Sequence, residues 1–565
     1  MNVQVVTSAS KKAECLSGAP AAIFVLTGAE IQRQGFATLP EVLRTVPGLY
    51  VSQTNAHTWQ ISARGFSDVN NNKMLVLVDG RSAYSMEPGT VYWDTLDISP
   101  ENIDRVEVIR GPGGALWGDN AVNGVTNIVL KSADQMQGAL LSTGASPETG
   151  YTATVRYGGQ FGSQVSYSFF GRAAYWEPFH NPDGSPGPDH FAFPQGGLRV
   201  DWVASSADAI SLEGSGYDGR SGQTGLQNNI PNSYLVKGGE VAFRWKHTLS
   251  KRASTDALAY CDWYARVGVP AEKRNRCDIE FQNSLQFNPR RSLIWGSSFF
   301  STGDDLTSDP APYIPERRRS NVVSAFAQCE YAILPDRLRA VGGVKLEHND
   351  YTGFEYQPQG RLVWTPGKAM SMWASISRSV RTPTRNNSDL NFLVPVGFSG
   401  GNPVFEHLIG EPALQAERIF AYEAGYRWRT HSSVSLDLAA YYNDYKGLIV
   451  PSAPVIQVFP DRTVLESHFI NGPNAQAGTQ HGGLLLQRDS NWVRCRAATA
   501  IRACLLPFRC GSRMAPRTTV DVQCLGSQPP VRPAFGNPGY GRWKSSGRNT
   551  TLGGDPVTLA LSRGS

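Results

Sequence analysis

Residues 164–176, QVSYSFFGRAAYW, alternate between two kinds of side chain. One face of an extended chain would carry Val165, Tyr167, Phe169, Ala173 and Tyr175. The other face would carry Gln164, Ser166, Ser168 and Arg172. A period of two is that of a β-strand whose faces lie in different environments. The stretch therefore predicts a strand with one apolar and one polar side.

The same alternation recurs along most of the chain after residue 138. It is clear in GLRVDWVA (197–204), GEVAFRWKHTL (239–249) and DALAYCDWYARV (256–267). Aromatic residues cluster near strand ends, and short turns such as LPDR (334–337) alternate with long loops rich in Gly, Pro and Asn. This combination is typical of an outer-membrane β-barrel with short periplasmic turns and long outer loops. A soluble propeller would repeat every 40 to 50 residues or so, and no such repeat is evident.

The first part of the chain has a different pattern, with mixed helix and strand signals from Pro20 to Ser132. Thr27 and Glu30 stand at capping-box spacing, and Gly35 follows as a helix stop. Thr38 and Glu41 repeat the spacing. Buried-type strands are expected at KMLVLVDG (73–80) and RVEVIRG (105–111). We therefore predict a compact α+β domain ahead of the barrel. No run of about 18 apolar residues is present, which excludes a helical membrane span.

Residues 101–133, ENIDRVEVIRGPGGALWGDNAVNGVTNIVLKSA, contain the densest motif. A dinucleotide-binding loop is excluded, because Leu116 stands where the third glycine should be. Together with ISARGF (61–66), MLVLVDGRS (74–82), SRSVRTPTRN (377–386) and LQAERIFAYEAGYRWR (414–429), the block resembles TonB-dependent outer-membrane receptors. The resemblance covers about residues 2–475.

The resemblance implies an α+β plug domain inside a transmembrane antiparallel β-barrel, which has 22 strands in the family. We expect a flexible arm at 1–12, the plug at 13–133 and the barrel at 134–475. At about ten residues per strand, the last range holds about 17 strands, so the barrel would be incomplete.

The arm carries VQVVTSA (3–9), which looks like a TonB box, with Val3, Val5, Val6 and Thr7 as the TonB-binding residues. Such a segment would pair as an added strand with a sheet edge of TonB, which acts with ExbB and ExbD. No signal peptide is visible, so we expect the true precursor to begin upstream of Met1.

Two further groups of residues follow from the resemblance. Arg64, Glu107 and Arg110 are expected to make plug–barrel contacts, or else ordinary ion pairs. His57, Trp59, Tyr84, Tyr92 and Trp93 are expected to face the outer vestibule and contact substrate. These aromatic residues could instead pack the plug against the barrel.

No enzyme, cofactor or metal site is expected. GFSGG (397–401) fits a nucleophile motif in form, but Asn402-Pro403 leaves no room for the helix that should follow. The loop with His180, Asp183, Asp189 and His190 lacks a metal-ligand spacing.

The expected function is active uptake of a scarce nutrient across the outer membrane of a Gram-negative bacterium, foremost a ferric siderophore. Haem and cobalamin are alternatives, and a bacteriocin or phage could use the same receptor. Nucleic acid is not an expected partner, because residues 476–565 hold twelve Lys plus Arg against three Asp, so the basic charge lies outside the main body.

Residues 476–565 differ from the rest of the chain. VRCRAATAIRACLLPFRC (493–510) holds three cysteines and four arginines without alternation, and Pro529, Pro530 and Pro533 would interrupt any strand. We therefore expect this Arg-, Cys- and Pro-rich segment to be out of frame. The alternative function is a truncated, non-functional receptor relic.

Overall fold

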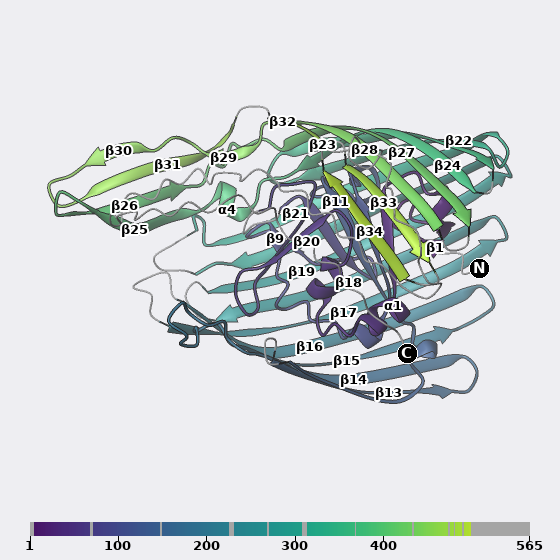
Figure 1. Cartoon of the computed structure of the whole chain (residues 1–565), viewed down its shortest axis with the longest axis horizontal. Coiled ribbons are helices and arrows are strands. Elements are labelled where there is room, and N and C mark those ends of the chain that lie inside the picture. The colour runs from purple at the N-terminus through teal and green to yellow at the C-terminus, as the bar shows by residue number, and fades with distance from the viewer. Residues whose placement is uncertain are drawn as a thin grey trace, which may run out of the picture.

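The computed structural model describes residues 5–67, 72–146, 150–224, 231–267, 271–307, 313–367, 369–431, 434–472, 475–479, 481–488 and 491–498. A small α+β domain lies inside a large antiparallel β-sheet that curves around it (Figure 1). This is the predicted plug-in-barrel fold. No helix among the described residues combines the length and the apolarity that crossing a membrane would require.

The barrel sheet contains eighteen strands in the described residues, and their order follows the chain. Its strands are β12 (Gly138–Ser146), β13 (Gly150–Phe161), β14 (Val165–Trp176), β15 (Phe191–Val203), β16 (Asp208–Thr224), β17 (Pro231–Ser250), β18 (Ala253–Val267), β19 (Glu272–Asn288), β20 (Arg291–Asp305), β21 (Arg317–Leu334), β22 (Leu338–Asn349), β23 (Gly353–Gly367), β24 (Met370–Arg381), β27 (Glu417–His431), β28 (Val434–Lys446), β32 (Ala475–Thr479), β33 (His481–Arg488) and β34 (Asn491–Ala498). Turns such as residues 161–165 join the strands at one end, and longer segments such as 176–191 join them at the other. The short-turn end is the periplasmic side of such barrels.

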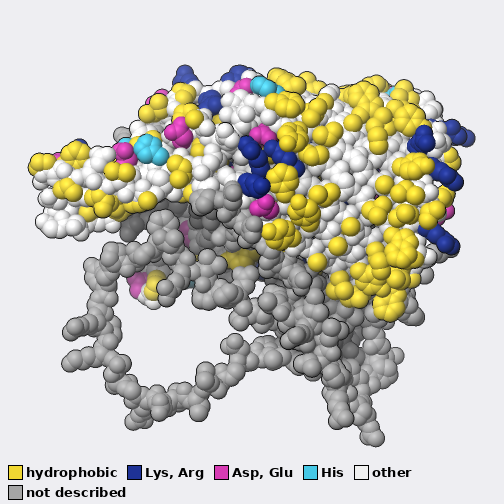
Figure 2. All heavy atoms as spheres, turned by 90° about the horizontal axis from the view of Figure 1, so that it is seen from above, with side chains coloured by type: hydrophobic (Ala, Val, Ile, Leu, Met, Phe, Trp, Pro, Cys, Tyr) yellow, Lys and Arg dark blue, Asp and Glu magenta, His cyan; other side chains and the backbone are white. Residues whose placement is uncertain are grey.

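The alternation predicted for residues 164–176 is confirmed in β14. Ser168 and Arg172 are buried on the inner face against the plug, whereas Phe169 is 53% exposed on the outer face. Figure 2 shows hydrophobic side chains spread over the outside of the barrel. An apolar outer band is what a lipid-facing barrel wall requires.

The sheet extends past residue 475, where the sequence predicted the barrel to end. β32 and β33 pair with successive parts of β28, and β34 pairs with β33. Strand pairing uses backbone N–H and C=O groups, so it does not depend on the side-chain alternation that the prediction followed. Residues 499–565, and with them most of the segment expected to be out of frame, lie outside the described residues.

The plug is built on a five-stranded sheet in the order β3-β10-β11-β6-β7. The elements of the arm and plug are β1 (Val5–Val6), β2 (Glu14–Cys15), η1 (Leu16–Gly18), β3 (Ile23–Thr27), α1 (Gly28–Gln34), α2 (Leu39–Arg44), β4 (Leu49–Gln53), β5 (Trp59–Ala63), β6 (Met74–Val78), β7 (Arg81–Ser82), β8 (Tyr84–Ser85), β9 (Thr90–Val91), η2 (Pro100–Asn102), β10 (Ile103–Arg110), α3 (Gly114–Trp117), β11 (Gly124–Leu130) and η3 (Ala133–Met136). Both predicted capping boxes are present, at Thr27 with Glu30 and at Thr38 with Glu41, and Gly35 ends α1 with a φ of 68°.

The two faces of the plug sheet pack against different partners. Phe24 and Leu26 of β3 point into the core formed with α1 and α2. Ile23 and Val25 point the other way and pack with Val6 and Ala9 of the N-terminal arm. The period of two in β3 thus places helices on one face of the sheet and the arm on the other.

A second, smaller sheet projects from the outer end of the barrel (Figure 1). Its elements, and the short helix before them, are α4 (Arg385–Ser388), β25 (Asn391–Ser399), β26 (Asn402–Ile409), β29 (Ile449–Pro451), β30 (Val455–Val458) and β31 (Thr463–Asn471). β26 and β31 pair in parallel, which joins the β24–β27 connection to the β28–β32 connection. GFSGG forms the tip of the β25–β26 hairpin, where Gly400 and Gly401 have φ values of 58° and 89°.

Candidate functional site

The N-terminal arm is held inside the barrel against the plug sheet. The Glu107 carboxylate, on β10, accepts hydrogen bonds from the backbone N–H groups of Thr7 (2.9 Å) and Ser8 (2.8 Å). It also accepts the hydroxyl protons of Thr7 (3.1 Å) and Ser8 (2.6 Å), and it pairs with Arg105. Glu107 is fully buried. One buried carboxylate therefore holds two consecutive residues of the arm.

Barrel side chains hold the rest of the arm. Lys11 pairs with Glu280 of β19, and its ammonium lies 4.6 Å from the ring centre of Trp117. Lys12 pairs with Glu330 of β21 at 2.5 Å. Burial lowers the pKa of Lys11, and the charge of Glu280 opposes that effect. The arm is thus tied to the wall by charged contacts that must all break before it can leave.

Arginines of the wall also bind the arm through its backbone. Arg361 donates to the carbonyl of Ala9 at 3.0 Å, and just beyond the arm Arg427 donates to the carbonyls of Leu16 (2.9 Å) and Ala19 (2.7 Å) at the start of the plug. These contacts need carbonyl groups only, so they fix the path of the arm without requiring particular arm side chains.

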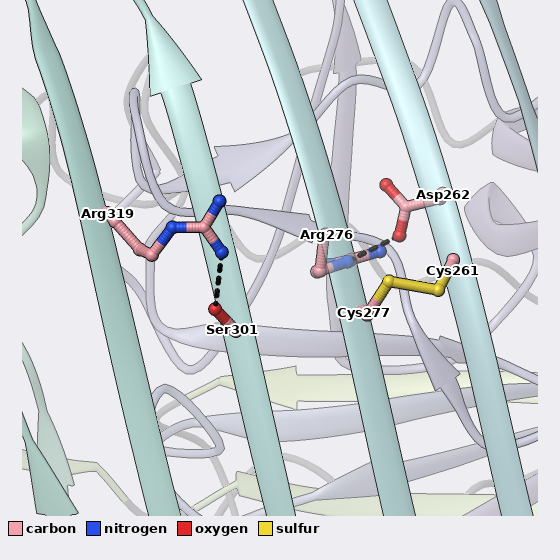
Figure 3. The surroundings of a disulfide bond; sticks show 6 residues. All are labelled: Cys261, Asp262, Arg276, Cys277, Ser301 and Arg319. Carbon is pink, nitrogen blue, oxygen red and sulfur yellow. Dashed lines mark hydrogen bonds and ion pairs between the residues drawn. A yellow bond between two sulfur atoms is a disulfide. The ribbon is translucent and has the colours of Figure 1, made fainter.

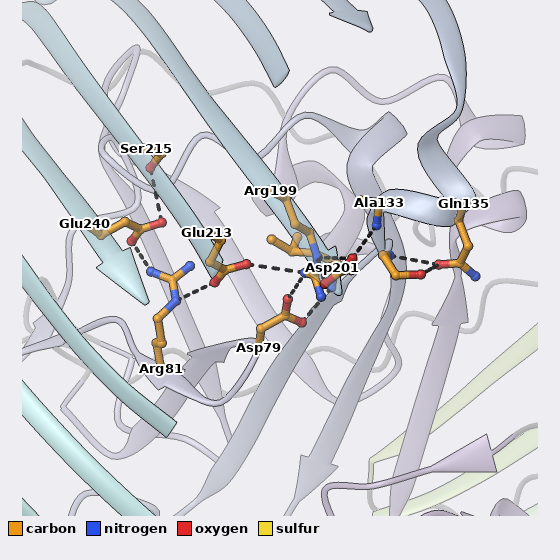
Figure 4. Close-up of polar contacts among 11 residues, drawn as sticks. Asp79, Arg81, Ala133, Gln135, Arg199, Asp201, Glu213, Ser215 and Glu240 are labelled. Atoms are coloured by element: carbon orange, nitrogen blue, oxygen red, sulfur yellow. Dashed lines mark hydrogen bonds and ion pairs between the residues drawn. The ribbon is translucent and has the colours of Figure 1, made fainter. Parts of the chain in front are cut away.

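The flank of the plug is joined to the wall by a network of ion pairs (Figure 4). Arg81 lies between Glu213 (3.0 Å) and Glu240. Arg199 pairs with Asp79 of the plug at 2.8 Å and with Glu213 at 3.3 Å. Arg81 is 6% exposed. The network couples plug and barrel where little water can replace a lost partner.

The outer surface of the plug meets the barrel around Asp94. Arg266 of β18 binds the Asp94 carboxylate at 2.7 Å, and His57 Nδ1 lies 3.7 Å from it. Burial raises the pKa of Asp94, but Arg266 and His57 outweigh it and lower that pKa to about 2. Asp94 therefore carries its charge at every physiological pH.

Sequence comparison identifies both parts of the chain. The family model described as the TonB-dependent receptor plug domain matches residues 16–125, and the model described as the TonB-dependent receptor-like β-barrel matches residues 135–481. This chain belongs to the TonB-dependent receptor family. Members of the family are receptors and transporters and not enzymes, and the fold places this receptor in the outer membrane of a Gram-negative bacterium.

Curated relatives match most of the receptor at low identity. The vitamin B12 transporter BtuB of Vibrio vulnificus is 25% identical over 470 residues, which cover 80% of this chain and 71% of that protein. An iron-regulated outer membrane virulence protein of Vibrio cholerae is 25% identical over 486 residues, 79% of this chain and 69% of that protein.

Solved structures share the fold. The siderophore receptor PirA from Pseudomonas aeruginosa has a TM-score of 0.66 and 20% identity, covering 82% of this chain and 81% of that one. A mutant of the ferric enterobactin receptor PfeA of the same organism, in complex with enterobactin, has a TM-score of 0.68 and 18% identity, covering 83% of this chain and 79% of that one.

Of the residues nominated for plug–barrel contact, Arg64 binds the barrel wall, whereas Arg110 forms a hydrogen bond within the plug. Arg64 pairs with Glu423 of β27 and lies 4.0 Å from the ring centre of Tyr441. Arg110 donates to the carbonyl of Pro47 at 3.2 Å, and burial lowers its pKa against the opposing charge of Asp437 on the wall.

The expected barrel contact of Glu107 is corrected. Its side chain lies on the plug face that the arm covers, so its partners are Thr7, Ser8 and Arg105. The motif around β10 gave no indication of which face Glu107 would use, because the arm that covers this face lies about 100 residues earlier in the chain.

Three of the four predicted TonB-binding residues lie in the part of the docked arm that the structure describes. Val6 is fully buried, Val5 is 43% exposed, and Thr7 is bound to Glu107. Val3 lies outside the described residues. β1 pairs with β2, which lies just after the arm, so the arm already has a strand partner within the receptor.

Three of the five residues nominated for substrate contact are buried. His57, Tyr84 and Trp93 are 2%, 4% and 6% exposed. His57 Nε2 lies 3.0 Å from both the Ser221 hydroxyl and the Gly222 carbonyl, and the ring stacks on Phe191. These side chains pack the plug instead of facing the vestibule, which is the alternative that the sequence left open.

The other two nominated residues are half-buried. Trp59 packs on the plug core, and the guanidinium carbon of Arg44 lies 5.3 Å from the centre of its ring. The Tyr92 hydroxyl lies 2.8 Å from both Glu87 and Glu272, and its ring stacks on Tyr264. Tyr92 therefore connects the plug to Glu272 at the outer end of β19.

The sequence reasoning missed two arginines at the outer end of β24, Arg381 in its last position and Arg385 just after it. Arg381 pairs with Glu417 at 2.9 Å, and the fully buried Arg385 pairs with Asp304 at 3.1 Å. Both lie in SRSVRTPTRN, a motif that was used only for the resemblance. Charged residues concentrated in one motif of a chain with 18% charge were the available signal.

Metal coordination finds no support in the described part of the chain, where no group of three or more His, Cys, Asp or Glu side chains is arranged to hold an ion. In the loop before β15, Asp189 accepts backbone N–H groups of Ala56 (2.7 Å) and Phe179 (3.1 Å). Its carboxylate fixes the loop on the plug.

Proposed function

We propose that the receptor imports a ferric siderophore and that TonB, acting with ExbB and ExbD, supplies the energy. The observation that carries the proposal is the docked arm. A short segment with a strand-forming sequence is held by one carboxylate and a few ion pairs and carbonyl contacts, so it can be released as a unit. A released arm could pair with a sheet edge of TonB through its backbone.

Relatives named for iron support a ferric siderophore as the substrate. The ferric enterobactin receptor PirA of Pseudomonas aeruginosa is 22% identical over 557 residues, 83% of this chain and 74% of that protein. Haem is less well supported, because His57 is 2% exposed and its Nε2 faces Ser221 and Gly222. Cobalamin is the second candidate, because a vitamin B12 transporter is 25% identical.

Uptake in a deletion strain tests the substrate. The strain carries the full chain on a plasmid and is given radiolabelled iron in a panel of siderophores, or radiolabelled cobalamin. We expect uptake of iron with one siderophore and none of cobalamin. Cobalamin uptake alone would replace the proposed substrate, and no uptake of any ligand would favour the receptor relic.

Arm variants test the coupling. Val6→Pro removes a backbone N–H that strand addition needs, whereas Val6→Ala keeps it. We expect V6P to abolish uptake but retain binding of the siderophore to cells, and V6A to transport. Equal transport by both variants would contradict coupling through this arm.

Assembly separates a working receptor from a relic. A folded outer-membrane barrel migrates faster on a gel before heating than after it. A heat-modifiable band in the outer-membrane fraction is expected, and protein found only in inclusion bodies would support the relic.

A bacteriocin or phage would first reach the outer sheet, where Phe398 is 81% exposed.

A further inference from the structure

A disulfide joins two neighbouring strands of the barrel wall. Cys261 of β18 and Cys277 of β19 lie opposite each other in register and are bonded through their sulfur atoms (Figure 3). The two cysteines are 16 residues apart in the sequence. The other cysteines of the described residues, Cys15 and Cys329, have no cysteine opposite them in register. Strand pairing thus brings together one particular pair of thiols.

The disulfide lies on the lipid-facing side of the wall. Asp262 and Arg276 stand next to the two cysteines and point into the lumen, where they pair and Arg276 donates to the carbonyl of Tyr84 of the plug at 3.0 Å. Side chains alternate between the two faces of a strand, so the cysteines point outward. Two neighbours on that face, Trp263 and Ile279, are apolar and 49% and 60% exposed. The bond therefore lies within the apolar band of the outer surface.

The charged side chains of these strands leave their register open. Asp262 binds both Arg274 (3.0 Å) and Arg276, which lie two residues apart on β19. A slip of two residues would keep every side chain on its own face and still place a cation opposite Asp262. The disulfide does not tolerate this slip. Diagonal residues on paired strands are about 7 to 8 Å apart, whereas a disulfide usually needs about 4.4 to 6.8 Å between Cα atoms.

The register of β19 positions two contacts with the plug. Arg274 donates to the Ser85 hydroxyl at 2.8 Å, and Arg276 donates to the carbonyl of Tyr84 at 3.0 Å. A slip of two residues would move both guanidinium groups by about 7 Å along the wall, and both contacts would be lost. The disulfide therefore selects the register in which these strands fit the plug.

The assembled wall is a poor place to make this bond. Disulfide formation needs a thiolate, and apolar surroundings disfavour the charged form of a thiol. A protein oxidant would also have to reach sulfur atoms that acyl chains cover. Oxidation therefore has to precede the entry of β18 and β19 into the membrane, in the oxidising periplasm.

We propose that the Cys261–Cys277 disulfide clamps the register of β18 and β19, and that a periplasmic dithiol–disulfide oxidoreductase closes this clamp before the strands enter the membrane. One receptor thiolate attacks the oxidoreductase disulfide, forms a mixed disulfide and releases one oxidoreductase sulfur as a thiolate. The second receptor thiolate attacks the receptor sulfur of the mixed disulfide, which forms the clamp and releases the other oxidoreductase sulfur. The receptor loses two electrons and two protons, and the oxidoreductase is reduced to its dithiol. The proposal is independent of the transported substrate.

Blocking barrel assembly in cells that make the full chain tests the order of events. The cells are depleted of the machinery that inserts barrels, free thiols are capped with N-ethylmaleimide, and a tryptic digest is examined by mass spectrometry without reduction. Trypsin releases peptides 253–266 and 277–290, which stay joined only through the Cys261–Cys277 bond. We expect the joined peptides within twofold of their level in undepleted cells, and at least a tenfold loss in cells that lack the oxidoreductase. Capped peptides alone in depleted cells would overturn the proposal.

Cysteine variants test the clamp itself. The heat-modifiable band of C261A/C277A should be at least threefold weaker than that of the wild type, whereas C15A/C329A, which also removes two thiols, should match the wild type. Ala259 and Ile279 are the next pair in register on the same face. Adding A259C and I279C to C261A/C277A relocates the clamp and should restore the band. Equal bands for the wild type and C261A/C277A would overturn the register role, as would a relocated disulfide that forms without restoring assembly.

Discussion

Glu107 concentrates the arm's contacts with the plug sheet on one side chain. Its carboxylate receives four hydrogen bonds from Thr7 and Ser8 in a fully buried position. Hydrogen bonds to a charged group contribute roughly 1.5 to 3 kcal/mol each. Glu107→Gln removes the charge and places an amide N–H group against the N–H and O–H donors of Thr7 and Ser8. We expect the free energy of arm docking to fall by about 2 kcal/mol or more.

Trypsin reports this change, because Lys11 and Lys12 lie in the docked arm and Lys11 is protected there by its pairing with Glu280. Cleavage at these lysines should be at least tenfold faster in E107Q than in the wild type. Glu101→Gln is the control, since Glu101 is a plug carboxylate that binds Ser99 and Ser142 and not the arm. Equal cleavage rates in all three proteins would contradict the assigned role of Glu107.

Asp94 makes the stability of the receptor depend on pH in the acid range. Its pKa of about 2 lies below the value of about 3.9 for an unfolded aspartate. The ion pair with Arg266 therefore adds about 2 kcal/mol above pH 4, and this contribution is lost as pH falls through 2. Asp94→Asn removes the contribution at every pH.

Unfolding in guanidinium, followed by tryptophan fluorescence, measures the effect. The wild type should exceed D94N by about 2 kcal/mol or more at pH 5, and most of this difference should vanish by pH 2. Asp218→Asn is the control, because Asp218 is an exposed partner of Lys237. A difference between the wild type and D94N that stays constant with pH would show that Asp94 acts through packing alone.

Single-residue roles were predicted from sequence only where the role is local. The strand face of Phe169 follows from its neighbours, and that prediction is confirmed. The environments of His57, Tyr84 and Trp93 depend on barrel strands far along the chain, such as Phe191 stacked on His57. An aromatic residue in a loop fits a ligand site and a packed seam equally well, so its type could not decide between them.

The outer sheet is the element least accessible to prediction. Its hairpin tip at GFSGG was considered from the sequence only as a nucleophile motif, whereas the parallel pairing of β26 with β31 joins segments almost 60 residues apart. Capping boxes are readable because their residues are three apart, as at Thr27 and Glu30. Pairing between two loops leaves no comparable local pattern.

Removing the β25–β26 hairpin separates assembly from ligand binding. If residues 392–408 are replaced by a short Gly-Ser linker, β24 and β27 can still pair from Met370 with Trp428 to Arg381 with Glu417. We expect a normal heat-modifiable band and at least a tenfold loss of affinity for the siderophore identified by uptake. The parallel partner of β31 would be gone, so the outer sheet would lose its longest cross-loop contact.

Ser399→Ala at the hairpin tip is the control for this deletion. It keeps the turn of Gly400 and Gly401, so binding and assembly should match the wild type. Failure of the deletion variant to assemble would show that the hairpin is needed for folding. Unchanged affinity in an assembled deletion variant would remove the outer sheet from ligand binding.

At the scale of the whole molecule, the barrel was predictable because period-two alternation recurs along the chain. The plug was predictable because the motif of residues 101–133 precedes that alternation. The estimate of about 17 strands lies close to the eighteen described, but the described count includes strands beyond residue 475. Loss of side-chain alternation hid those strands. The charged seam between plug and wall was also hidden, since its plug residues, Asp79 and Arg81, lie far in the sequence from its wall residues, Arg199, Glu213 and Glu240.

Arg81 tests how that seam keeps the receptor closed. It is 6% exposed between Glu213 and Glu240, so Arg81→Gln leaves two carboxylates facing each other beside the plug. Breaking a buried ion pair costs about 3 to 5 kcal/mol. We expect R81Q cells to admit a large glycopeptide antibiotic and to stop growing at severalfold lower concentrations of it than wild-type cells. The triple variant R81Q/E213Q/E240Q removes the uncompensated charges and should restore resistance, because the seam then contains no unpaired ion. Continued sensitivity of the triple variant, with a normal heat-modifiable band, would mean that packing and not charge pairing seats the plug.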